Sequence, residues 1–192
     1  ITKRFDGKLV DGDEYRQLQQ MVDDRFGSWR PDAIEKAYNE REFSVAVRAI
    51  MKYADEANEM IHELAPWEIA KDSSRDDELQ RVCSLGIQLF YILSCYLKPI
   101  LPETVKQIEG FLNCESLKWP KLTKDEPVSN LLLPAGHAIN SYKHLMTRID
   151  AKKVEALVAA NKQTLVATVA VQPTDKATAV IEPIAETIGI DD

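Results

Sequence analysis

Apolar residues recur at helical spacing along much of the chain. The strongest pattern runs from Ile34 to Leu64, where apolar positions recur mainly every three or four residues and charged residues fill the other faces. This spacing predicts a long amphipathic helix. One stripe of this helix comprises Phe43, Val47, Ile50, Met51, Ala54, Ala57, Asn58, Ile61 and Leu64, which are apolar except for Asn58. Pro66 disfavours helical backbone at Ala65, so the helix should end there, and the proline suits the start of a short helical turn.

Further segments show the same periodicity. Residues 79–97 predict a second long helix, which Pro99 ends, and Gly86 lies on its apolar stripe. Because glycine is a poor helix former, we interpret Gly86 as a point where a neighbouring helix approaches closely. Residues 102–113 predict a third helix that begins with a proline, and residues 13–26 predict a shorter one.

The remaining segments complete a fold prediction. Prolines and a glycine interrupt residues 113–140, which indicates a loop, and residues 151–162 return to helix. The rest of the chain lacks aromatic residues and is rich in alanine, valine and threonine, which favours an extended or disordered tail. Short connections favour antiparallel helices. We therefore predict an all-α helix bundle with an extended C-terminal tail, as a helical domain over 1–162 and a linker over 163–192.

Composition and charge exclude several classes of protein. The chain has 192 residues, of which 45% are hydrophobic, enough for one sizeable core. A net charge of −7 argues against binding nucleic acid through bulk electrostatics. No apolar run is long enough to span a membrane, and three cysteines without CxxC spacing indicate reduced thiols, so we predict a cytoplasmic protein without membrane contact. Because no methionine begins the sequence, we expect the chain to be part of a longer protein.

Candidate catalytic groups do not form a recognisable set. The sequence contains no phosphate-binding glycine loop and no GxSxG motif, and its three histidines lie far apart. We predict no catalytic and no metal-binding residues. Trp67 is the main candidate for recognition, because it follows a helix end where a nucleic-acid base could stack on its ring. Since tryptophans are mostly buried, the residues alone favour a core position for Trp67 and for Trp119, and the choice for Trp67 stays open.

Several stretches resemble, in order and spacing, the C-terminal portion of bacterial methionyl-tRNA synthetases. They are "KRFDGKL", "REFSVAVRAIMKYADEANEMIHELAPWEIAK", "CSLGIQLFYILSCYLKPILPETVKQIEGFLN" and "LMTRIDAKKVEALVAANK". The resemblance implies the helix-bundle anticodon-binding domain of class I synthetases. It implies tRNA anticodon recognition within methionine–tRNA ligase, which makes methionyl-tRNA, AMP and diphosphate from ATP, methionine and tRNA.

The resemblance also implies roles for particular residues. The tryptophan of the family's "APW" motif stacks on the first base of the CAU anticodon, so this role would fall to Trp67. Lys3, Arg4 and Lys71 become candidates for contacts with the tRNA backbone. The family's other main anticodon readers, an asparagine and an arginine, precede the "KRFDG" match and would lie upstream of Ile1.

The catalytic parts of the family lie outside this region. The full-length enzyme is expected to use ATP, magnesium and a structural zinc, and none of its catalytic motifs occurs in this sequence. The chain alone should therefore be inactive, with the catalytic domain of the same protein as a partner. A homodimer would form through a tRNA-binding domain after the tail. Two alternatives stay open: the anticodon-binding domain of another class I synthetase, and a helical adaptor that binds protein partners.

Overall fold

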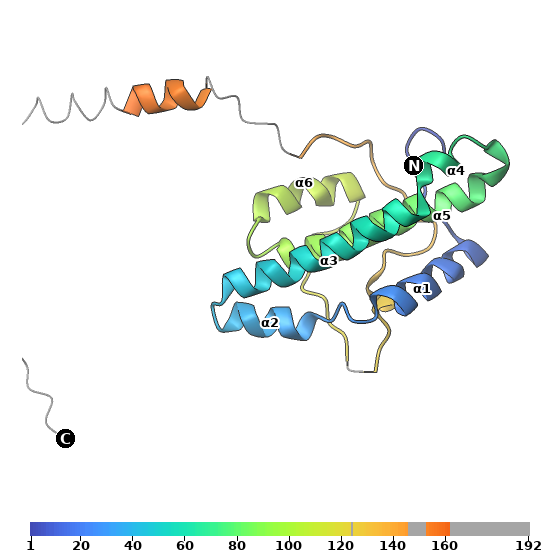
Figure 1. Cartoon of the computed structure of the whole chain (residues 1–192), viewed down its shortest axis with the longest axis horizontal. Coiled ribbons are helices and arrows are strands. Elements are labelled where there is room, and N and C mark those ends of the chain that lie inside the picture. The colour runs from blue at the N-terminus through green and yellow to red at the C-terminus, as the bar shows by residue number, and fades with distance from the viewer. Residues whose placement is uncertain (124, 146–152, 162–192) are drawn as a thin grey trace, which may run out of the picture. The chain divides into compact units, whose positions relative to one another are not determined.

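The computed structural model describes residues 1–123, 125–145 and 153–161 of the chain. The chain forms two compact units, Ile1–Leu145 and Met146–Asp192. The first unit is a bundle of helices with one isolated antiparallel bridge, between Lys8 and Ala138 (Figure 1). In the second unit residues 153–161 are helical, in agreement with the predicted helix there. The predicted tail at 163–192 lies outside the described residues.

Six α-helices and two short 3-10 helices build the described part of the first unit. They are α1 (Gly12–Phe26), α2 (Pro31–Asn39), α3 (Phe43–Leu64), α4 (Pro66–Ile69), η1 (Ser73–Arg75), α5 (Asp76–Leu97), α6 (Pro102–Leu112) and η2 (Val128–Leu131). Helix α5 is central, because α1, α3, α4 and α6 all pack against it, while α2 packs against α3. The predicted all-α bundle is confirmed, as are the helix ends before Pro66 and Pro99.

The predicted helix over Ile34–Leu64 is wrong in one respect, because two helices share this range. Helix α2 ends at Asn39, Arg41 takes a left-handed backbone conformation with φ of 61°, and α3 begins at Phe43. The residues at the break are polar, so the turn removes no apolar side chain from the core. The two segments instead pack against each other. The predicted apolar stripe is also too wide, since Phe43 and Met51 are exposed.

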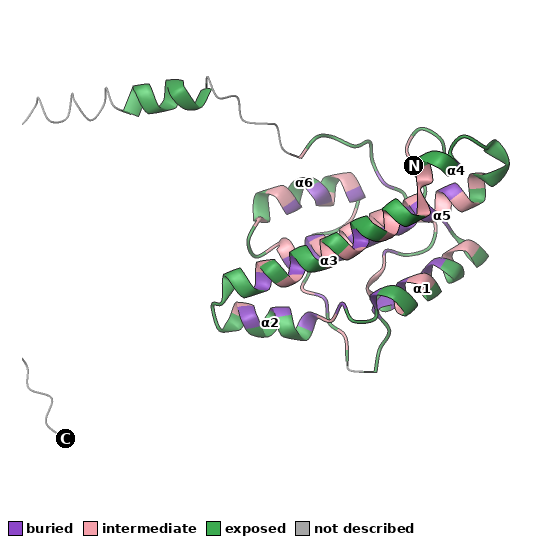
Figure 2. Ribbon diagram, viewed as in Figure 1, coloured by how far each residue is buried: buried purple, intermediate pink, exposed green. Residues whose placement is uncertain are grey.

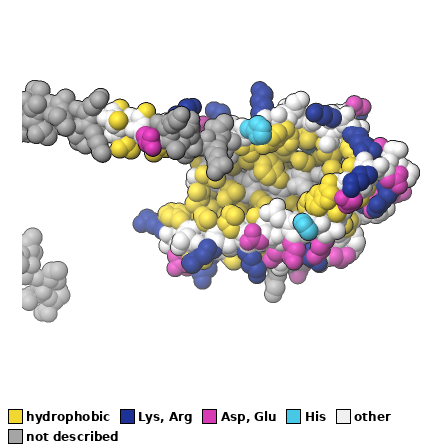
Figure 3. Space-filling view, turned by 45° about the horizontal axis from the view of Figure 1, so that its top comes forward, with side chains coloured by type: hydrophobic (Ala, Val, Ile, Leu, Met, Phe, Trp, Pro, Cys, Tyr) yellow, Lys and Arg dark blue, Asp and Glu magenta, His cyan; other side chains and the backbone are white. Residues whose placement is uncertain are grey.

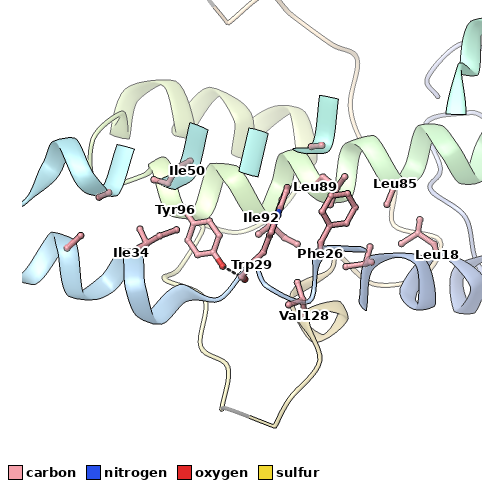
Figure 4. Close-up of a cluster of buried hydrophobic side chains, with 14 of the residues drawn as sticks. Leu18, Phe26, Trp29, Ile34, Ile50, Leu85, Leu89, Ile92, Tyr96 and Val128 are labelled. Atoms are coloured by element: carbon pink, nitrogen blue, oxygen red, sulfur yellow. Dashed lines mark hydrogen bonds between the residues drawn. The ribbon is translucent and has the colours of Figure 1, made fainter. Parts of the chain in front are cut away.

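Buried residues are concentrated along α5 (Figure 2), and the core there includes several aromatic side chains. Trp29, in the connection between α1 and α2, is fully buried, and its ring stacks on Tyr53 of α3 at a centroid distance of 4.9 Å. Its indole nitrogen donates a hydrogen bond of 2.7 Å to Glu56. The Tyr96 hydroxyl donates to the Trp29 carbonyl at 3.0 Å (Figure 4), so both the indole nitrogen and the carbonyl of Trp29 have partners.

The loop that follows α6 is held to the bundle by buried and partly buried hydrogen bonds. The amide side chain of Gln88, in the middle of α5, accepts from the Leu133 backbone nitrogen at 2.8 Å and donates to its carbonyl at 3.0 Å. Asp23 of α1 accepts from both the backbone nitrogen and the hydroxyl of Ser129. These contacts give the loop a fixed path across the bundle although it has little regular structure.

No helix of the described residues is both long and apolar enough to cross a membrane.

Candidate functional site

A sharp bend joins α3 to α4 and places Trp67 at the end of the bundle; residues 64–71 are called the elbow below. Ala65 adopts a left-handed conformation, with φ of 42° and ψ of 61°, and its backbone nitrogen donates to the Ile61 carbonyl at 3.1 Å. Pro66 then occupies the first position of α4, where its missing N–H costs no hydrogen bond. The predicted helix, bend and further helical turn are confirmed.

The ring of Trp67 projects from the elbow into solvent. Its exposed fraction is 51%, whereas Trp29 in the core is 0% exposed. This exposure excludes the buried position that the residues alone favoured. One neighbour is His62 in the last turn of α3, whose ring centroid lies 5.7 Å from that of Trp67 with the planes at 65°. The imidazole therefore packs edge to face with the indole.

An apolar cluster under the elbow fixes its position. Ile69, Leu79 and Val82 are buried together, and Phe5 from the N-terminal segment packs against them. Ile69, two residues after Trp67, thus points inward while the indole stays outside. The short helix α4 can be stable in this setting because packing, and not its own length, holds it.

The basic residues predicted to contact a tRNA backbone lie near the elbow, but two have partners within the protein. Arg4 forms an ion pair of 2.5 Å with Asp76 and donates a hydrogen bond of 3.0 Å to the Ala70 carbonyl. Lys71 forms an ion pair of 2.6 Å with Glu68. Lys3 is exposed and has no ion pair with another described residue. Arg4 therefore ties the N-terminal segment to the elbow, whatever else it contacts.

Carboxylates just after the elbow keep this surface mixed in charge. Hydrogen bonds from the side chain and the backbone nitrogen of Ser74 lower the pKa of Asp72, which therefore stays ionised at neutral pH. A hydrogen bond from Arg75 likewise lowers the pKa of Glu78. Because acidic and basic groups alternate here, the ring of Trp67 and not an excess of positive charge is the distinctive feature of this surface.

Sequence reasoning misses one residue of the elbow and misplaces another tryptophan. The sequence indicates no role for His62, although a histidine one turn before a helix-ending proline is well placed to meet an aromatic residue beyond the bend. Trp119, predicted to be buried, is only partly buried, between Tyr38 and Tyr96. Its indole nitrogen has no hydrogen-bond partner among the described residues.

Metal ligands do not gather in the described part of the chain, where no group of three or more His, Cys, Asp or Glu side chains could hold an ion.

Comparisons with known proteins show which family the chain belongs to. Residues 10–162 match the anticodon binding domain of methionyl tRNA ligase. The methionine–tRNA ligase of Nitrosomonas europaea is 56% identical over the whole of this chain, and that of Ralstonia nicotianae is 41% identical. The chain spans 28% of the length of the first relative and 26% of the second.

Solved structures show the same fold. The apo form of Mycobacterium tuberculosis methionyl-tRNA synthetase superimposes with a TM-score of 0.56 and 17% identity, over 78% of this chain and 29% of that chain. The same enzyme bound by methionyl-adenylate gives a TM-score of 0.53. At this identity the likeness shows the fold alone. Together with the sequence match over residues 10–162, it establishes that the chain belongs to the family of anticodon-binding domains of methionyl-tRNA ligase.

Proposed function

We propose that this chain recognises the CAU anticodon of the methionine tRNA and that the exposed ring of Trp67 is a stacking surface for the first anticodon base. The observation that supports the proposal is the 51% exposure of an indole at a bend that packing holds rigid. An exposed ring of this kind offers about 1–3 kcal/mol of stacking energy per base. Stacking tolerates any base, so other groups must supply the preference for cytosine.

The longer protein is proposed to be a methionine–tRNA ligase, which joins methionine to its tRNA with ATP and releases AMP and diphosphate. The naming of the relatives and the match over residues 10–162 support this. ATP, magnesium and a structural zinc belong in this proposal to the rest of that protein. We predict that the 192-residue chain alone shows no methionine-dependent exchange of diphosphate into ATP. Exchange by a preparation free of host synthetase would contradict this.

The binding proposal can be tested with short RNAs. An anticodon stem-loop with a CAU loop and one with the same bases permuted would be titrated against the longer protein by fluorescence anisotropy. The CAU loop should bind more tightly, and Trp67→Ala should weaken its affinity by about 1–3 kcal/mol. Equal binding of both loops would favour a helical adaptor that binds protein partners, and would contradict anticodon recognition.

Phe43 provides a matched control for Trp67. It is exposed to nearly the same fraction, 52%, but it begins α3, whereas Trp67 follows the end of that 22-residue helix. The two rings are therefore about 30 Å apart along the helix axis. Phe43→Ala should leave RNA affinity unchanged. If Phe43→Ala weakened binding as much as Trp67→Ala, a general effect of exposed apolar groups would replace the stacking proposal.

Domain limits, partners and location are proposed on the same basis. The helical domain is proposed to end at residue 162, where the family match ends, and residues 163–192 are proposed to link it to a further domain. Limited proteolysis should cut first within 163–192, and early cuts inside α3 or α5 would contradict this. The catalytic part of the same protein is the proposed intramolecular partner, with a homodimer of the full-length enzyme in the cytoplasm.

A further inference from the structure

The N-terminal segment, residues 1–8, is fixed to the bundle independently of the elbow. The carbonyl of Gly7 accepts a hydrogen bond of 2.8 Å from the backbone nitrogen of Ile139, in the loop after α6. The carbonyl of Lys8 accepts one of 3.0 Å from the side chain of Gln80 on α5. A side chain that extends from this segment to the elbow therefore starts from a position that the rest of the bundle sets.

Arg4 joins this segment to the end of α4 and the start of α5. Its Nη1 atom donates to the Ala70 carbonyl at 3.0 Å. Its Nε and Nη2 atoms donate to the two carboxylate oxygens of Asp76 at 3.3 and 2.5 Å. Ala70 is the C-cap of α4, and its backbone nitrogen donates to the Pro66 carbonyl at 2.9 Å. The carbonyl that Arg4 holds therefore belongs to the helical turn that carries Trp67.

The hydrogen bonds of Arg4 leave it poorly placed to bind a tRNA phosphate. All three guanidinium nitrogens already donate to protein acceptors, and the carboxylate of Asp76 balances their charge. A phosphate would have to compete with these acceptors for the guanidinium. At the end of the bundle that carries α4, on the right of the space-filling view, basic and acidic side chains are interspersed (Figure 3). Mixed charge of this kind favours a contribution of Arg4 through structure and not through attraction of RNA.

We propose that Arg4 is a positioning residue for anticodon recognition, which holds the turn that carries Trp67 and does not bind a phosphate. The inference rests on the proposed stacking role of Trp67. Phe5, the next residue of the N-terminal segment, packs against the apolar cluster beneath the elbow. The segment thus supports the elbow by apolar contact and by hydrogen bonds. A ring held in place before the base arrives needs less ordering on binding, so a fixed elbow strengthens stacking.

Substitutions of Arg4 separate positioning from phosphate binding. The affinity of the longer protein for the CAU stem-loop would be measured at several salt concentrations. Arg4→Ala should weaken binding about three- to tenfold, which is part of the stacking contribution of Trp67, with the dependence of log Kd on log salt unchanged. Arg4→Lys should weaken it nearly as much, because an ammonium does not reproduce the planar fork that Arg4 presents to its two partners. Loss of a phosphate contact would instead lower the salt slope by about 0.7–0.9, and lysine would keep most of the affinity.

Asp76 gives a test in which the two roles predict opposite signs. Asp76→Ala removes a negative charge and frees the guanidinium of Arg4, so a phosphate-binding arginine would hold RNA more tightly. A positioning arginine loses its carboxylate partner, so affinity should fall about three- to tenfold, as for Arg4→Ala. Asp77→Ala is the matched control, because it removes the same charge from the same turn of α5. It should not weaken binding.

Hydrogen exchange tests the tie without RNA. The backbone nitrogen of Ala70 donates to Pro66 and that of Asp72 to Ile69. Both amides should exchange about tenfold faster in Arg4→Ala than in the parent, whereas amides in the middle of α1 should exchange at the parent rate. In the full-length enzyme, kcat/KM for tRNA should fall by the same factor as the affinity, with methionine-dependent exchange of diphosphate into ATP unchanged. A residue needed only for folding would lower both activities together.

Each contrary result has a distinct meaning. Tighter binding by Asp76→Ala, or a lower salt slope for Arg4→Ala, would assign Arg4 to a phosphate and overturn the proposal. Parent-like affinity of both variants, with binding weakened by Trp67→Ala, would overturn it and leave the proposed function intact. Equal losses from Asp76→Ala and Asp77→Ala would overturn it as well. No preference of the parent for the CAU loop would contradict the proposed function itself, and the role of Arg4 in recognition would fail with it.

Discussion

Trp29 and Trp67 are the same kind of side chain in opposite surroundings. Trp29 is 0% exposed and has a stacked neighbour in Tyr53, an edge contact with Phe26 and a hydrogen bond to Glu56. Trp67 is 51% exposed, and its ring has an edge-to-face contact with His62. The burial of Ile69, two residues further on, leaves the indole outside while fixing its position. Rigidity and burial are therefore separable: the elbow is rigid because of what lies beneath it.

The largest expected effect is a loss of folding stability on substitution of Trp29. Trp29→Ala should lower the free energy of unfolding by about 3–5 kcal/mol, because it empties the space against Tyr53 and Phe26 and removes the indole N–H that donates to Glu56. Urea denaturation followed by circular dichroism would measure it. Trp29→Phe keeps a ring and should lose less. A loss below about 1 kcal/mol for the alanine variant would mean that the core collapses into the space without cost.

Trp67→Ala should have the opposite effect to Trp29→Ala: it should impair the reaction with tRNA and leave stability nearly unchanged. Its unfolding free energy should change by less than about 1 kcal/mol, as for other surface substitutions, because half of the ring is already in water. In the full-length enzyme, kcat/KM for tRNA should fall by an amount equal to about 1–3 kcal/mol of lost stacking. Trp67→Phe should lose less because a ring remains. A large loss of stability with normal charging by the folded enzyme would show that Trp67 is a packing residue after all.

A substitution at Ala65 tests the backbone conformation of the elbow without changing Trp29 or Trp67. It holds a left-handed conformation that alanine adopts at a cost, and glycine adopts it freely. Ala65→Gly should therefore raise the unfolding free energy by about 0.5–1 kcal/mol, the strain relieved being partly offset by greater freedom of the unfolded chain. Asn113 ends α6 in the same conformation, and Asn113→Gly is the matched control. A stability loss at Ala65 alone would show that the alanine methyl packs usefully.

The smallest effect concerns the charge beside Trp67. Glu68 pairs with Lys71 at 2.6 Å on the exposed side of the elbow. Glu68→Gln should leave stability within about 0.5 kcal/mol, because exposed pairs contribute little. It should raise affinity for an anticodon stem-loop about two- to fivefold at low salt, by freeing the lysine and removing a negative charge. Glu40→Gln, at the distant Lys36–Glu40 pair, should not change affinity. Equal gains from both variants would show a general effect of net charge.

Much of this architecture could be predicted from local sequence. The helices from Gly12 to Phe26 and from Asp76 to Leu97 agree with their periodic patterns, and Pro66 marks the bend. The break between α2 and α3 could not be predicted in this way. Apolar residues recur at helical spacing on both sides of the polar residues 39–42, which could equally be one exposed turn of a single helix. Only the packing of α2 back on α3 shows that the chain turns there. Periodicity reports which face of a segment is apolar, not whether two segments are one helix.

The sequence by itself determined the fold class, the proline bend and the family, because helix periodicity, proline stereochemistry and motif order depend on residues near one another in the chain. Tertiary structure decided which tryptophan is buried. Trp29 meets Tyr53 and Tyr96, residues from two other helices, whereas the ring of Trp67 is half exposed and meets His62, only five residues back in the sequence. Arg4 likewise became a structural tie only when folding brought Asp76 to it. Burial and ion pairing depend on such distant neighbours, and the order of residues along the chain does not specify their distances.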